Sequence, residues 1–151
     1  MDWGSAIWAG ILGTIVMSVL MYMGKAMGMP MDMPRMLGAM VVDPSRGAVV
    51  AIGIIAHVMM GVLFAIVYAL LFDAADIDPS WLWGAVLGAV HGVIAGLAMG
   101  MMPAMHPRMG TSKALPEPGP FGRNLGAMIP VGIIVLHLVF GTVIGAVYSP
   151  A

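Results

Sequence analysis

The sequence predicts an all-α integral membrane protein, a four-helix bundle, from its composition and its apolar stretches. Hydrophobic residues make up 61% of the 151 residues and charged residues only 9%, whereas a soluble domain carries about 25% charged residues. The apolar stretches cover residues 3–24, 48–72, 81–102 and 126–148. Each reaches the roughly 20 residues that a helix needs to cross about 30 Å of hydrocarbon. We therefore expect a single transmembrane domain over residues 1–151.

The distribution of charge predicts the orientation of the helices. Asp2 and the acidic turn over residues 73–80 lie on one side of the expected membrane. All six basic residues lie on the other side, in the connections between the first and second and the third and fourth helices: Lys25, Arg35, Arg46, Arg108, Lys113 and Arg123. Short loops rich in lysine and arginine stay in the cytoplasm. Both termini should therefore face outward (N-out/C-out) from a bacterial inner (cytoplasmic) membrane. Amphipathic aromatic rings prefer the interface between membrane and water. At the outer interface we expect Trp3, Trp8, Trp81, Trp83, Tyr68 and Tyr148.

An internal repeat divides the domain into two tandem helix pairs. Three residues of the second helix return in the fourth with the same spacing, displaced by 80 residues: His57, Gly61 and Tyr68 as His137, Gly141 and Tyr148. The segment RMLGAM at residues 35–40 returns as RNLGAM at residues 123–128. Repeat one covers residues 1–72 and repeat two residues 81–151. Because each copy holds two helices, a pseudo-two-fold axis along the membrane normal should relate the copies.

The two copies should differ where they approach the membrane from the cytoplasm. In the first copy, Asp32 can cap a short helix. The apolar face of that helix suits a position in the membrane interface and comprises Met33, Met36, Leu37, Met40 and Val41. In the second copy, the corresponding segment should run directly into the fourth helix.

Small residues predict how the helices pack. The third helix has a glycine at every fourth position: Gly84, Gly88, Gly92, Gly96 and Gly100. The first helix offers Ala6, Gly10, Thr14 and Ser18 with the same spacing, and the fourth offers Gly141 and Gly145. Ridges of this kind let helix backbones approach closely, within the chain or between chains. Clearing space for a ligand is the alternative role.

Three histidines should lie near the middle of the membrane: His57, His91 and His137, on the second, third and fourth helices. An ionisable residue at that depth is expensive and is a functional-site hypothesis by default. Three neutral imidazoles could bind a Cu, Zn or Fe ion. His57 and His137 alone could be the axial ligands of a b-type haem, with Gly61 and Gly141 clearing room for it. The alternatives are hydrogen bonding that fixes helix packing and a proton relay. His106, in the loop after the third helix, should be solvated.

Methionine is unusually frequent, with 18 residues against 13 leucines. Most lie in two runs on the predicted cytoplasmic side, over residues 27–40 and 99–109. Thioethers suit Cu(I), and methionine is also an adaptable apolar filler, so both interpretations stay open. The chain has no cysteine, and soft-metal chemistry would have to use methionine and histidine.

Several classes of function are disfavoured. The chain has no basic stripe, which argues against a nucleic-acid partner. It has no serine triad, paired carboxylates, zinc-protease motif or phosphate loop, and we expect no enzymatic activity. Besides the lipid bilayer, the expected partners are a larger membrane complex or further copies of the chain, for which it would be an accessory or scaffold subunit. A small conduit for metal ions or protons is a further interpretation.

One resemblance adds to this picture. The stretch from His57 through Tyr68, followed by Trp83-Gly84, His91 and Met102-Pro103, resembles small uncharacterised bacterial inner-membrane proteins of the YagU-like type. The resemblance implies a multi-helix inner-membrane protein. It brings no functional residue with it.

Overall fold

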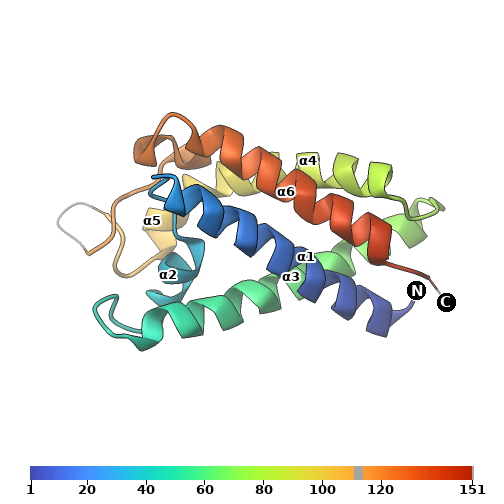
Figure 1. Cartoon of the computed structure of the whole chain (residues 1–151), viewed down its shortest axis with the longest axis horizontal. Coiled ribbons are helices and arrows are strands. Elements are labelled where there is room, and N and C mark those ends of the chain that lie inside the picture. The colour runs from blue at the N-terminus through green and yellow to red at the C-terminus, as the bar shows by residue number, and fades with distance from the viewer. Residues whose placement is uncertain (111–113, 151) are drawn as a thin grey trace.

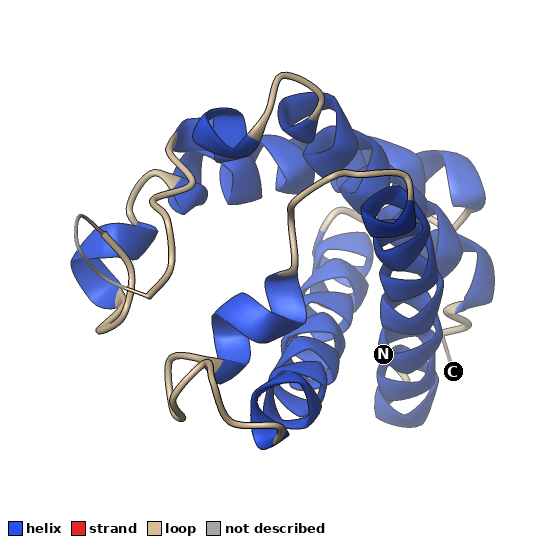
Figure 2. Cartoon of the chain, turned by 60° about the vertical axis from the view of Figure 1, so that its left-hand side comes forward, coloured by secondary structure: helices blue, strands red, loops and turns tan. Residues whose placement is uncertain are grey.

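Four long helices form the body of the molecule in a computed structural model that describes residues 1–110 and 114–150. They are α1 (Trp3–Ala26), α3 (Ala48–Ala74), α4 (Trp81–Met99) and α6 (Ile129–Val147). Each is long and apolar enough to cross a membrane, so the four predicted spans are confirmed. Every regular element of the described residues is a helix (Figure 2).

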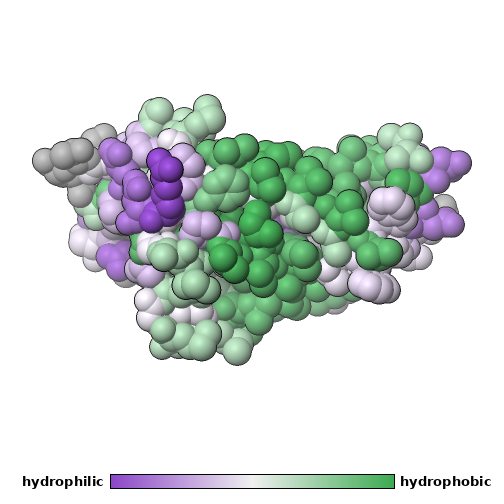
Figure 3. All heavy atoms as spheres, turned by 90° about the horizontal axis from the view of Figure 1, so that it is seen from above, coloured by the Kyte–Doolittle hydropathy of each residue, from purple (hydrophilic) through white to green (hydrophobic). Residues whose placement is uncertain are grey.

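The two ends of the bundle differ in content. Both termini lie at one end (Figure 1), together with the connection between α3 and α4. The connections that hold the basic residues lie at the other end, although one of these residues, Lys113, is outside the described part of the chain. On the face that Figure 3 shows, a broad apolar band lies between the two ends, with hydrophilic residues on either side of it. This is the surface that a helix bundle needs in order to sit across a bilayer.

Two short segments differ from the prediction: the one that follows the third span and the one that precedes the fourth. Pro103 lacks the N–H that would bond to the Met99 carbonyl. The helix α4 therefore ends at Met99, and α5 (Met102–Met105) follows as a separate turn. The segment before α6 does not run directly into it, as predicted. It forms the 3-10 helix η1 (Pro120–Leu125), and Gly126 then separates the two helices with φ 154°, a value that favours glycine.

The four long helices pack in the order α3, α1, α6, α4. Thr14 on α1 fills the space where Gly61 on α3 lacks a side chain, and Gly10 lies against the backbone of Val62. Gly84 and Gly88 of α4 lie directly against the backbone of α6. The glycines further along, Gly96 and Gly100, instead receive the rings of Phe121 and Pro120. The small-residue ridges thus bury helix against helix within the chain.

The short helix α2 (Met33–Gly38) begins at Asp32, whose carboxylate accepts a hydrogen bond from the Arg35 N–H at 3.0 Å. This confirms the predicted cap. Pro34 and Gly38 of this helix pack against the backbone of α3. The helix ends before Met40, which is left exposed. A neighbouring helix therefore holds α2, and its place in the membrane interface stays a prediction.

Aromatic residues are divided between surface and interior. The tryptophans are exposed as expected for interfacial anchors: Trp3, Trp8, Trp81 and Trp83. Tyr68 and Tyr148 were predicted with them but are buried, 3% and 5% exposed. Tyr148 stacks on Phe72 with the ring centroids 6.3 Å apart, and Tyr68 turns inward toward α4. Both belong to a hydrophobic core at the terminal end of the bundle.

Candidate functional site

His57 lies inside the bundle on the face of α3 that meets α1. Its side chain is 6% exposed, and its Nδ1 atom lies 3.4 Å from the Ser18 hydroxyl oxygen of α1. Gly61, one turn further along α3, brings α1 close enough for this contact. His57 is thus engaged by α1, the helix that precedes α3 in the order of the long helices.

His91 and His137 lie side by side. They come from α4 and α6, and their ring centroids are 4.7 Å apart with the planes at 73°. The close approach of the two helices at Gly88, which lies against the His137 backbone, makes this contact possible. Two of the three predicted site residues are therefore in direct contact.

The Nδ1 atom of each of the three histidines has a polar neighbour. His137 Nδ1–H donates to the Ile133 carbonyl at 2.8 Å, and the Tyr68 hydroxyl lies 3.3 Å from His91 Nδ1. His57 Nδ1 faces Ser18 in the same way. No hydrogen bond in the described part of the chain uses any of the three Nε2 atoms. Because His137 Nδ1 carries the proton, its Nε2 holds the lone pair that a metal ion requires.

The surroundings of the histidine pair are apolar and aromatic. The Phe64 ring centroid lies 4.1 Å from that of His91, and the Phe140 ring centroid lies 6.0 Å away. The only charged side chain on α3, α4 and α6 is Asp73, in the last turn of α3. An ion held here would have neutral protein ligands and would keep its own charge, which favours an ion of low charge or one that brings an anion.

The three histidines do not form one cluster. Among the described residues, no group of three or more histidine, cysteine, aspartate or glutamate side chains is arranged to hold a metal ion. His57 faces α1 while the other two face each other. The arrangement offers an imidazole pair, and the three-histidine site stays a prediction.

The space for a haem beside the repeated histidines is already filled. Gly61 and Gly141 were expected to clear room for the macrocycle. Thr14 instead occupies the space beside Gly61, and the backbone of α4 at Gly84 and Gly88 lies against Gly141. These two glycines serve helix packing, and the residues present do not fit a haem at this position.

Sequence reasoning missed two groups of interacting residues. Tyr68 was interpreted as an interfacial anchor, although it lies eleven residues, or about three helical turns, after His57 and so on the same face of α3. His106 was expected to be solvated, but it is 2% exposed. Its Nε2–H donates to the Met36 carbonyl at 2.9 Å, and its Nδ1 accepts from the Arg108 N–H at 3.1 Å. Nothing local in the sequence signals this contact, because its partners are 70 residues apart.

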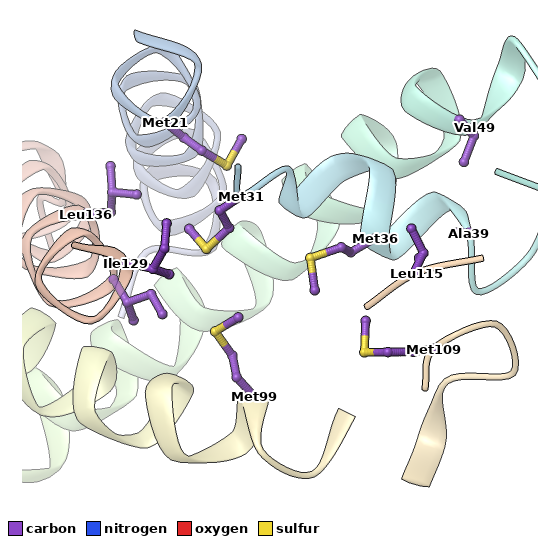
Figure 4. Close-up of a cluster of buried hydrophobic side chains, with 11 residues drawn as sticks. Met21, Met31, Met36, Ala39, Val49, Met99, Met109, Leu115, Ile129 and Leu136 are labelled. Carbon is purple, nitrogen blue, oxygen red and sulfur yellow. The ribbon is translucent and has the colours of Figure 1, made fainter. Parts of the chain in front are cut away.

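The two methionine runs meet at the basic end of the bundle. Figure 4 shows side chains of both runs, from the loop before α2, α2 itself and the end of α4, directed into a common core together with Met21 of α1. The buried members are Met21, Met31, Met36, Met99 and Met109. Met17, Met29, Met33 and Met102 pack against them. We call these nine residues the methionine cluster.

Fold and site together define a helical multi-pass membrane protein with a histidine pair inside the bundle and a methionine cluster at one end. The chain belongs to DUF6789, a family of unknown function, whose model matches residues 1–151. No curated protein matches the chain, and no solved structure matches it.

Proposed function

We propose that the chain is a non-enzymatic protein of a bacterial inner membrane, oriented with both termini outward, that binds a transition-metal ion through His91 and His137. The observation that carries the proposal is the contact between these two rings, whose centroids are 4.7 Å apart. Copper, zinc and iron all accept imidazole ligands. His57 is the third ligand if the ion draws in all three histidines.

The hydrogen bonds around the pair support this function. Histidines that bind metals commonly donate their second ring N–H to a carbonyl or another fixed acceptor, which orients the ring and sets its tautomer. The Ile133 carbonyl is such an acceptor for His137, and the Tyr68 hydroxyl oxygen is placed to be one for His91. These partners would hold the two Nε2 atoms available to an ion.

Metal analysis of the gently purified protein tests the proposal. The wild type should hold a stoichiometric metal ion, or take one up from solutions of Zn²⁺, Cu²⁺ or Fe²⁺. His91→Ala and His137→Ala should each remove most of it, since either loses a ligand. Tyr68→Phe keeps the ring and loses only the hydroxyl, and it should lower the affinity about 10–100-fold, as expected for a partner that orients a ligand.

Two further outcomes define the site. Retention of metal in His57→Ala assigns the ion to the pair alone, and loss assigns it to all three histidines. A wild type that takes up none of the three metals, with the three substitutions changing only stability, would leave the histidines as hydrogen-bonding partners between helices. Such contacts contribute roughly 0.6–2 kcal/mol each.

The second candidate is an accessory subunit of a membrane complex. It is favoured by exposed methionines at the basic end, beyond the apolar cores of the spans: Met27, Met101 and Met105 are 78%, 66% and 70% exposed. Methionine adapts well to partner surfaces. Mass measurement of the protein in its native membrane assembly distinguishes the two candidates, because only the subunit should be found with a different chain.

A further inference from the structure

The methionines of this chain are concentrated in one part of the structure. Helix α6 has none in 19 residues, and α4 has only Met99. The long helix α3 has only Met59 and Met60, which are exposed. If methionine were a general filler of apolar surfaces here, it would be spread over all four spans. Its concentration at the basic end indicates a use for the thioether itself.

Three thioether side chains line one small cavity in this region. Met21 comes from α1, and Met29 and Met31 come from the loop that follows it; the cavity is about 10 Å³ and is closed by Ile129, Gly132 and Leu136. Met29 reaches this position because the chain turns at Gly28, with φ +95°. Its N–H then bonds to the Gly24 carbonyl at 3.0 Å. No lining side chain carries oxygen or nitrogen. The volume is at the lower limit for one water molecule.

The local electrostatics suit a monovalent cation. The cavity lies beside the C-terminal turn of α1, where helix carbonyls carry partial negative charge and the Lys25 ammonium is paired with the Asp32 carboxylate. Neutral thioethers do not offset the double charge of Zn²⁺, whereas a single positive charge costs less to bury. The Tyr22 hydroxyl is buried without a hydrogen-bond partner among the described residues, and Tyr22 packs against the hydrophobic core that contains the methionine cluster.

We propose that Met21, Met29 and Met31 form a binding site for a soft monovalent metal ion, Cu(I). Each sulfur would donate a lone pair to the ion, with no change in oxidation state and no proton released. Soft thioether ligands select Cu(I) over harder divalent ions. The site is separate from the histidine pair, and the proposal does not rest on the pair binding metal.

Silver provides the probe, because Ag(I) is a soft monovalent ion that needs no reductant to stay monovalent. The detergent-purified full-length protein is titrated with Ag(I), and Cu(I) is then measured by competition with a Cu(I) chelator. The wild type should bind one Ag(I) per chain at this site, and Zn²⁺ in excess should not displace it. Met31→Leu and Met21→Leu should each lower the Ag(I) affinity about tenfold or more, since losing a ligand costs at least as much as losing a partner that orients one.

Matched variants separate binding from packing. Leucine is close to methionine in volume, so these substitutions should leave thermal stability nearly unchanged. Met27→Leu removes a thioether that is 78% exposed in the same loop and should not affect binding. His91→Ala and His137→Ala should not affect it either, which distinguishes this site from the histidine pair. The proposal is overturned if the wild type binds no Ag(I). It is also overturned if the double variant Met21→Leu/Met31→Leu binds Ag(I) as tightly as Met27→Leu does.

Discussion

Gly84 and Gly141 lie so close that a Cβ atom on either would overlap the carbonyl oxygen of the other. The contact is reciprocal, and it brings α4 and α6 together in the halves that lie nearer the chain termini. Gly88 and Gly145 extend the same seam. Neither helix can gain a side chain here without moving the other backbone.

The first prediction follows from this contact. Gly84→Leu should destabilise the protein by about 1–3 kcal/mol or more, because the added atoms must separate two backbones. Val90→Leu is the control, since Val90 lies on the same helix and is 53% exposed. Unfolding in detergent measures both. Equal stability of the two variants would mean that α4 and α6 are not in contact at Gly84.

The second prediction concerns orientation. The chain has no native cysteine, so single cysteines can be labelled without background. Ala75→Cys lies in the exposed turn after α3, and Ser45→Cys lies in the exposed connection before it. A membrane-impermeant thiol reagent applied to intact spheroplasts should label the first and not the second, because the basic connections should stay in the cytoplasm. The reverse pattern would place both termini in the cytoplasm.

The third prediction concerns His106. Its ring joins the segment after α5 to α2, and the adjacent Arg108 guanidinium donates to the Ala39 carbonyl at 2.7 Å. His106→Leu should cost about 1–3 kcal/mol, because the Met36 carbonyl and the Arg108 N–H lose their partner in a buried place. It should also speed proteolysis of this segment.

Met105→Leu is the matched control for His106→Leu, because the neighbouring Met105 side chain is 70% exposed. Proteolysis at the wild-type rate in both variants would show that the buried ring does not hold the segment against α2.

The spans and the Asp32 cap could be predicted from the sequence because their causes are local. A run of apolar residues specifies a span, and a carboxylate three residues before a free N–H specifies a cap. The rotation of each helix about its axis is set by its neighbours. Depth alone put His57, His91 and His137 together, whereas the structure turns His57 toward Ser18 and brings only the other two into contact.

The remaining differences have the same origin. The burial of His106 depends on a carbonyl in α2, and no local pattern reveals it. The break before α6 depends on the backbone at Gly126, where the second copy was expected to differ from the first by running directly into the helix. The tandem duplication itself and the resemblance to YagU-like proteins stay predictions.

The packing of α1 on α6 joins the first and the last of the four spans to leave the ribosome. While the chain is being synthesised, α1 can pair only with α3, through Gly10 and Thr14. The contact between α1 and α6 can form only after α6 has entered the membrane. We therefore expect the molecule to assemble as two helical hairpins, α1 with α3 and α4 with α6, that dock last. A hydrogen bond from the Ser149 N–H to the Ser5 hydroxyl, at 2.8 Å, joins the two ends of the chain in the finished fold.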